Sequence, residues 1–497
     1  MTMKLHFPLL SSAAVLLGIV PQNPDEPPAA EPTATAPVVP GGVSVAAAAS
    51  RIDALVEAQI RRAGQRANPR ADDAAFLRRT YLGLAGRIPT LSETTAFLGS
   101  QDHDKRARLI DSLIGSPGYQ SHMFNFWADL LRVKSRLNNQ VSGEPFIHFI
   151  KQSIADNKPY DKFVREMLVA EGPAHAQGNG ATGLLMRDRG MPLDSMANTV
   201  RVFLGTRLEC AQCHDHPFDK WKQKDFYEMA AFAGGVAYRA QLDREQAPAL
   251  AEVAKELRDK RDRQGLQALG RLVRGVQSGI SGTGTGLIRL PKDYKYDNGK
   301  ANQLVRAKAI FGTSPAIAVA DPNAPKAKPK TGSKSKRKSW RERQRERQEA
   351  QRRQREMRQR RNQVGQRGVK TRDAFADWLT AKSNPRFTRV IANRMWEQAM
   401  GRALIEPVDN LMDNTKASNQ KLMEYLEQLM VQVGYDLQKF QRILFNTATF
   451  QRQVTRTEVP SDQTYLFQGP VLRRMTAEQI WDSLVTLVYD DIDDRLR

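Results

Sequence analysis

Cysteine and histidine are scarce in this 497-residue chain, which has two cysteines and seven histidines. Both cysteines fall in the stretch from Arg207 to Trp221, so any thiol chemistry depends on it. The hydrolase signatures His-Glu-x-x-His and Gly-x-Ser-x-Gly are absent, so nothing supports the commonest metalloprotease and serine hydrolase classes. Beyond the N-terminus no uninterrupted apolar run is long enough to span a bilayer, and we expect no transmembrane span apart from an N-terminal anchor.

Acidic residues are outnumbered, with 54 Asp and Glu against 76 Lys and Arg, for a net charge of +22. Residues 326–370 hold +15 of that excess, which leaves +7 for the rest of the chain. The basic charge is therefore local. We predict that residues 323–370 form a disordered, low-complexity insertion whose residues 326–370 bind acidic polymers of the cell envelope, with nucleic acid as the less favoured polyanion.

The N-terminus reads MTMKLHFPLLSSAAVLLGIV, in which Lys4 precedes an apolar run that ends at Val20. This pattern predicts a signal peptide over residues 1–20, with an uncleaved anchor or a buried first helix as the alternatives. Residues 21–50 are rich in Pro and Ala and have no helical or strand periodicity, so we expect a linker. Export to the periplasm or cell envelope would place both cysteines in an oxidising compartment.

Apolar residues recur at helical spacing on both sides of the basic insertion. Before it, Thr90 begins a capping-box pattern ahead of one helix, and residues 194–205 predict another helix that leads straight into the cysteine stretch. After it, Asn384 and Pro385 mark the start of a long helix. Between the two regions, residues 287–299 alternate and turn as a strand or hairpin does. The sequence thus predicts a mainly α protein, with two helical domains, a small β element between them and the disordered basic insertion.

Changes in these patterns also predict the domain boundaries. We expect a first helical domain with the cysteine motif at 51–240, a helical and small β connecting segment at 241–322, the insertion at 323–370, and the start of a second helical domain at 371–497. The second domain stops within or just after a helical pattern. We therefore expect either a naturally short domain or a fragment.

Cys210, Cys213 and His214 form a Cys-x-x-Cys-His motif. On a helix, positions i, i+3 and i+4 share one face, so two thiols and an imidazole can meet one planar partner. Covalent haem c needs this arrangement, with two thioether bonds to the porphyrin edge and an imidazole nitrogen on the iron. We therefore predict a mono-haem c site in which His214 is the proximal iron ligand.

Two other interpretations of this stretch stay open. Cys210, Cys213 and His216 can hold a small metal ion, non-haem iron or zinc, whereas the adjacent Cys213 and His214 point in different directions. Alternatively, Cys210 and Cys213 form a disulfide and the histidines are surface groups. The haem interpretation requires either a five-coordinate iron or a sixth ligand. The candidates for that ligand are His122, His148, His175, Met186, Met191 and Met196.

Long stretches of the chain resemble a known family. The first domain contains RRTYLGLAGRIPTLSETTAFL and FLGTRLECAQCHDHPFDKWKQKDFYEMAAFAGGV, and the second contains NPRFTRVIANRMWEQAMGRALIEPVDNLMDN. In this order they resemble the paired domains of unknown function found in planctomycete-type, cytochrome-associated exported proteins. The resemblance covers most of residues 70–497 apart from the basic insertion. It implies an exported protein of unassigned reaction, with a haem site that maps onto Cys210, Cys213 and His214.

We therefore expect an exported protein that carries one haem c and acts in electron transfer or in a redox step at the cell envelope, with an unidentified redox partner. The sequence names no catalytic residue, so whether the protein is an enzyme stays open. The alternative is a non-catalytic envelope or scaffold protein, with a Cys210–Cys213 disulfide and a polyanion-binding insertion.

Overall fold

The structure is a computed structural model of the chain. It describes residues 42–138, 141–176, 178–240, 246–282, 285–317, 371–456, 463–489 and 491–495. The expected signal peptide or anchor at 1–20 lies outside these residues, as do most of the 21–50 linker and the basic insertion at 323–370. Among the described residues, no helix combines the length and the apolar character needed to cross a membrane.

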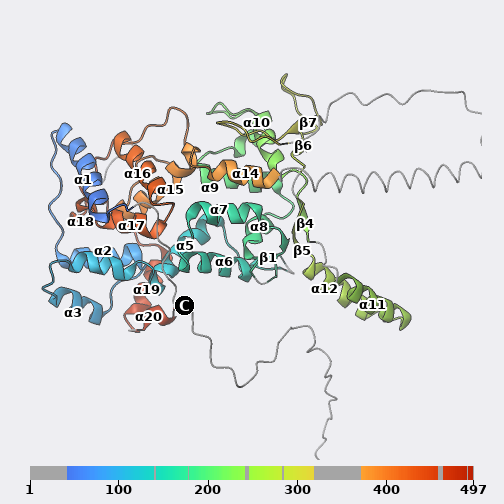
Figure 1. Ribbon diagram of the computed structural model, residues 1–497, viewed down its shortest axis with the longest axis horizontal. Helices are drawn as coiled ribbons and strands as arrows, with labels where there is room; N and C mark the ends of the chain where they lie inside the picture. Colours follow the sequence, from blue (N-terminus) through green and yellow to red (C-terminus); the bar gives the residue numbers. More distant parts are fainter. Residues whose placement is uncertain are drawn as a thin grey trace, which may run out of the picture. The chain divides into compact units, whose positions relative to one another are not determined.

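Helices dominate the described residues, as predicted, and the strands between them are short (Figure 1). The first helical region contains α1 (Val45–Arg62), α2 (Asp73–Leu84), α3 (Leu91–Gly99), α4 (Lys105–Leu113), α5 (Pro117–Leu131), α6 (Glu144–Ala155), α7 (Tyr160–Val169), α8 (Gly183–Arg187), α9 (Pro192–Leu204) and α10 (Gln223–Ala230). It also contains the 3₁₀ helices η1 (Gly180–Thr182), η2 (Glu209–Gln212) and η3 (Ala231–Ala233). Helix α1 begins inside the segment expected to be a linker, and Ser44 caps it by accepting a hydrogen bond from the Ala47 N–H at 3.3 Å.

The remaining helices belong to the connecting segment and to the second helical region. They are α11 (Gln246–Asp259), α12 (Arg263–Val276), α14 (Thr371–Thr380), α15 (Pro385–Met400), α16 (Gln420–Gln432), α17 (Leu437–Phe445), α18 (Ala448–Gln451), α19 (Ala477–Thr486) and α20 (Ile492–Arg495). Two expected starts are confirmed: Thr90 and Glu93 form the capping box of α3, and the Asn384 side chain caps α15 ahead of Pro385.

The strands form three small antiparallel sheets, with the orders β1-β2, β3-β5-β4 and β6-β7. Their bounds are β1 (Arg136–Asn138), β2 (Val141–Ser142), β3 (Gly172–Pro173), β4 (Ala237–Arg239), β5 (Ser278–Ser281), β6 (Leu287–Arg289) and β7 (Leu304–Arg306). The predicted β element is confirmed in part: β6 lies in the predicted stretch 287–299, but its partner β7 lies beyond that stretch, and Ile288 pairs with Val305. Strands β1 to β5 were not predicted, because two to four residues are too few to show an alternating pattern.

The two helical regions share one hydrophobic core. Tyr160 of α7 stacks on Phe387 of α15 with ring centroids 4.8 Å apart, and Phe232 of η3 stacks on Phe375 of α14 at 5.2 Å. In Figure 1, α14 and α15 (orange) accordingly lie beside α7 and α9 (green). Helix α1 packs against α16, α17 and α18. The Asp53 carboxylate of α1 accepts hydrogen bonds from two backbone N–H groups at the N-terminus of α18, those of Ala448 and Thr449. Among the described residues from 42 onwards, the two helical regions therefore pack as one unit.

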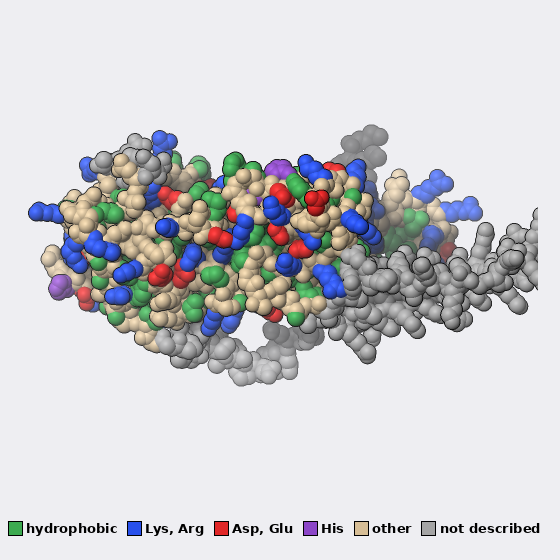
Figure 2. Space-filling view, turned by 90° about the horizontal axis from the view of Figure 1, so that it is seen from above, with side chains coloured by type: hydrophobic (Ala, Val, Ile, Leu, Met, Phe, Trp, Pro, Cys, Tyr) green, Lys and Arg blue, Asp and Glu red, His purple; other side chains and the backbone are tan. Residues whose placement is uncertain are grey.

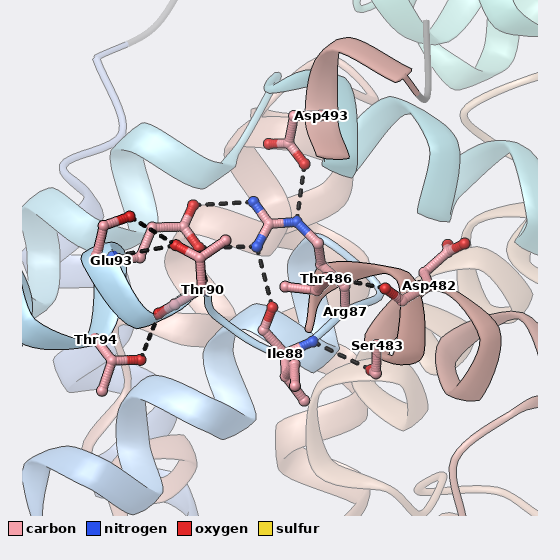
Figure 3. A network of polar contacts seen from close by, with 10 residues as sticks. Arg87, Ile88, Thr90, Glu93, Thr94, Asp482, Ser483, Thr486 and Asp493 are labelled. Carbon is pink, nitrogen blue, oxygen red and sulfur yellow. Dashed lines mark hydrogen bonds and ion pairs between the residues drawn. The ribbon is translucent and has the colours of Figure 1, made fainter. Parts of the chain in front are cut away.

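A buried arginine ties the start of the first region to the end of the second (Figure 3). Arg87, only 2% exposed, makes a bidentate contact with Glu93 at 2.8 and 2.9 Å and donates through Nε to Asp493 at 2.8 Å. The next N–H, of Ile88, donates to the Ser483 hydroxyl at 3.2 Å. The loop between α2 and α3 is thereby held against α19 and α20.

Charge outside the insertion is mixed. Figure 2 shows Lys and Arg side chains spread over one face of the described residues, with Asp and Glu side chains among them. This distribution agrees with the small excess of positive charge that remains once residues 326–370 are set aside. On this face no single basic patch of the kind that binds nucleic acid forms among the described side chains.

Candidate functional site

Helix α9 ends at Leu204, so the expectation that a helix runs straight into the cysteine stretch is wrong. Gly205 follows in a left-handed conformation with φ 57°, which turns the chain away from the helix axis. Its carbonyl accepts a hydrogen bond from the Leu411 N–H at 2.6 Å. Arg386 donates to the hydroxyl of the next residue, Thr206, at 2.6 Å. Groups from the second helical region therefore fix the loop that precedes the motif.

The cysteine motif forms one tight turn that begins in η2. The N–H groups of Cys213 and His214 both donate to the Cys210 carbonyl, at 3.3 and 3.4 Å. Within this turn Ala211 is fully buried, whereas Cys210, Cys213 and His214 are exposed. The two thiols are free, and they lie with the imidazole on the outward side of the turn. The three residues are thus exposed on a short 3₁₀ turn, and not on the α-helix that the sequence predicted.

The ring of His214 is oriented by a backbone contact. Its Nδ1 lies 2.7 Å from the carbonyl oxygen of Asp215. A carbonyl can only accept, so Nδ1 carries the proton of the neutral ring and Nε2 presents a lone pair. Metal-binding histidines commonly have this arrangement, in which one nitrogen binds the metal while the other donates to a carbonyl or carboxylate.

Asp215 holds the motif in place, a role that the sequence did not reveal. Its N–H donates to the Tyr296 hydroxyl at 2.9 Å, which joins the turn to the loop between β6 and β7. Its carboxylate accepts from the Gln223 N–H at 3.0 Å, at the start of α10, and pairs with Lys222 at 3.1 Å. Gln223 also donates to the Gln212 carbonyl at 3.1 Å. The motif is thus braced by α10 and by the β6–β7 hairpin.

His216 lies in a separate turn. Its N–H donates to the Trp221 carbonyl at 2.8 Å, and its Nδ1 accepts from the Phe218 N–H at 3.2 Å. Across the described residues, no three His, Cys, Asp or Glu side chains come together in a way that could hold a metal ion. The cluster of Cys210, Cys213 and His216 that a small metal ion requires is therefore not preformed here.

Two family models match the chain. Residues 51–238 match PSCyt2, a protein of unknown function (DUF1549), and residues 371–493 match PSD1, a protein of unknown function (DUF1553). The chain thus contains two paired domains of unknown function that are typical of planctomycete cytochrome-associated proteins. This confirms the resemblance inferred from the sequence. No curated protein and no solved structure gives a significant match.

The motif belongs to the PSCyt2 region, but the PSD1 region reaches it. Asp409 pairs with Arg207 at 2.6 Å, just before the motif. Asp413 forms an ion pair with Lys220, just after it, and a second one with Arg386 at 3.1 Å. In this chain the residues on both sides of the Cys-x-x-Cys-His turn are therefore held by both matched regions.

The PSCyt2 region also places aromatic side chains near the motif. Phe218, four residues after His214, is 86% exposed. Burial raises the pKa of the Tyr227 hydroxyl, and the negative charge of a Cys213 thiolate adds to the shift. Tyr227 therefore lies within electrostatic range of the second cysteine.

The candidate sixth ligands of the PSCyt2 region differ in accessibility. His148, His175 and Met191 are exposed, whereas Met186 and Met196 are buried, at 0% and 4% exposure. The Nε2 of His122 is shielded from solvent and has no hydrogen-bond partner among the described residues. None of the six joins Cys210, Cys213 or His214 through a hydrogen bond in the described structure. The structure therefore favours none of them.

Proposed function

We propose that Cys210, Cys213 and His214 hold one covalent haem c, and that the protein acts in electron transfer or in a redox step at the cell envelope. The observation that carries this proposal is the short exposed turn that holds Cys210, Cys213 and His214, with both thiols free. A small metal ion is less well supported, because His216 uses its Nδ1 in a separate turn.

The chemistry of the three groups suits haem. Cys210 and Cys213 would hold the porphyrin edge through two thioether bonds. Nε2 of His214 carries the lone pair for the iron, since Nδ1 is bonded to the Asp215 carbonyl. When bound, haem would supply one-electron redox chemistry. The chain's own contribution is to fix the turn through Asp215 and to set the imidazole tautomer.

Export of the protein and binding of acidic envelope polymers through residues 326–370 form part of the same proposal. The spacing of the cysteines, the signal-like N-terminus and the two paired domains typical of planctomycete cytochrome-associated proteins support it. An envelope location would supply the attachment machinery that haem c requires. The redox partner and the reaction stay unassigned.

The test is to produce the full chain in an exporting host that attaches haem c, and to measure the Soret band after denaturation and extraction of non-covalent haem. We expect covalent haem in the wild type and none in the Cys210→Ala, Cys213→Ala double variant. His214→Ala should change the iron ligation and the spectrum, whereas His216→Ala is the matched control and should leave both unchanged.

Three outcomes would contradict the proposal. Colourless protein without free thiols would favour the disulfide and scaffold alternative. Colourless protein with stoichiometric zinc or iron that is lost in His216→Ala would favour the small-metal alternative. A Soret band that survives in the double cysteine variant would show that haem binds elsewhere.

A further inference from the structure

A second candidate site lies away from the cysteine motif, where α2 faces the segment that leads into α19. A cavity of about 250 Å³ is present there. Its charged lining consists of four arginines, Arg78, Arg79, Arg473 and Arg474, and no Asp or Glu lines it. The first two belong to the PSCyt2 region and the last two to the PSD1 region. A pocket with four cations and no anion carries a positive potential that favours an anionic ligand.

Arg79 is the most deeply placed of these cations. Its guanidinium lies over the Phe450 ring, 4.9 Å from the centroid, and donates to the Arg452 carbonyl at 2.9 Å. Its Nε and Nη2 atoms are shielded from solvent and have no acceptor in the described structure. Burial lowers the pKa of Arg79 to about 10, and the positive charge of Arg106 adds to the shift. A buried cation without a counter-ion is unfavourable, and an anion in the adjacent cavity would relieve it.

Arg473 and Arg474 supply accessible donors. Both side chains are exposed, and neither forms an ion pair with a described carboxylate. Although Arg473 is exposed as a residue, burial of its guanidinium lowers its pKa, and Glu397 partly opposes this shift without coming within ion-pair distance. Other arginines of the same fold behave differently: Arg106 pairs with Asp73 at 2.7 Å. None of the four arginines that line the cavity forms an ion pair with a described carboxylate.

The rest of the lining is apolar or neutral. Leu82, Phe450 and Val471 form apolar walls, and Gln398 and Gln479 supply amides. The Gln479 amide is already committed to the Leu82 carbonyl at 2.8 Å. The volume lies just below the usual range of ligand pockets, which starts at about 300 Å³, so the ligand would be small.

We propose that this cavity binds a small organic anion, with a carboxylate, sulfate or phosphate group held by Arg473 and Arg474 in the field of Arg79, and an apolar body against Leu82 and Phe450. Arginine suits this task, because its planar fork matches the oxygen pairs of such groups. The site needs both matched domains and does not depend on haem at the cysteine motif.

Titration calorimetry on the full chain tests the proposal, with benzoate, phenyl sulfate and phenyl phosphate as probes and benzyl alcohol as the neutral control. We expect saturable binding of at least one anion, no binding of the alcohol, and a preference among the three that identifies the oxyanion. Arg79→Met and Arg473→Met should each weaken binding about tenfold or more. Arg61→Met, at a side chain that is 70% exposed on α1, should leave the affinity unchanged.

Two variants keep the test decisive, because Arg473 is exposed and its replacement should leave the fold intact even if Arg79→Met destabilises it. No saturable binding of any anion up to about 10 mM would overturn the proposal. So would equal affinities in the wild type and in Arg473→Met.

Discussion

Gly205 lies so close to Val390 that a Cβ atom at position 205 would come within 2.7 Å of the Val390 Cγ2 atom and 3.0 Å of the Val408 carbonyl oxygen. The same residue ends α9 in a left-handed conformation. We therefore expect Gly205→Ala to lower the free energy of unfolding by roughly 2–4 kcal/mol, from backbone strain and overpacking together. Urea unfolding followed by circular dichroism measures the change.

Gly434→Ala is the matched control for this prediction. Gly434 also has a positive φ, 68°, but a Cβ there would meet nothing within 4 Å. Only the strain of the left-handed conformation applies, so the loss should be about 1–2 kcal/mol. Equal losses at both positions would show that the contact between Gly205 and α15 is not as close as described.

Substitution of the buried Arg87 should lower the free energy of unfolding strongly. Arg87→Met leaves Glu93 and Asp493 without their shared cation, and these carboxylates are only 30% and 29% exposed. We expect a loss of about 2–4 kcal/mol, somewhat below the value for fully buried pairs. Arg61→Met removes a pair with Glu57 whose side chains are 70% and 41% exposed, and should lose less than about 1 kcal/mol. Comparable losses of stability in Arg87→Met and Arg61→Met would contradict the contacts of Arg87 with Glu93 and Asp493 shown in Figure 3.

His122 should make stability depend on pH. Burial lowers its pKa to about 4, with Arg473 adding to the shift and Glu478 opposing it. The pKa in the unfolded chain is about 6.5, so the unfolded state binds the proton first as the pH falls. The contribution of the neutral ring is thus complete above pH 6.5 and is lost progressively as the pH falls towards 4, to a total of roughly 2–3 kcal/mol.

The comparison of wild type with His122→Gln isolates this effect, because the carboxylates titrate in both proteins. Unfolding free energies at a series of pH values between 7 and 4 should fall more steeply for the wild type. Parallel curves would mean that His122 ionises equally in the folded and unfolded chains.

Both cysteine thiols should be reactive in folded, haem-free protein. Cys210 and Cys213 are exposed, so after reduction both should react with a thiol reagent at native pH without unfolding. The count in denaturant should be the same, and haem-loaded protein should show no reactive thiol. Thiols that react only after unfolding would contradict the exposed turn.

Helix positions could be predicted largely from local chemistry. The capping pairs at Thr90 and Asn384 and the apolar stripes after them were sufficient, because a helix end depends on residues within a few positions. The partner of each stripe was not predictable. A stripe shows that one face is buried, but not that Tyr160 meets Phe387, 227 residues later in the sequence.

The candidate site divides in the same way. The spacing of Cys210, Cys213 and His214 was visible in the sequence, whereas the bond between Asp215 and Tyr296 joins residues 81 positions apart. Gly205 was a readable signal for the end of α9, because glycine often follows the last turn of a helix. The arginines of the second cavity could not be recognised among so many basic residues, since only folding shows which of them lack a carboxylate.

The stacking of Tyr160 on Phe387 has a consequence for proteolytic cleavage of the chain and for the loss of one domain from its gene. A break in the polypeptide between residues 317 and 371 would leave two pieces whose apolar faces fit each other, so the nicked protein should stay together without a covalent link. Neither piece could leave on its own without exposing its half of the core to water. Packing therefore requires that the two domains occur together. If a gene lost one domain, the remaining domain would need polar residues on the apolar face that the lost domain had covered.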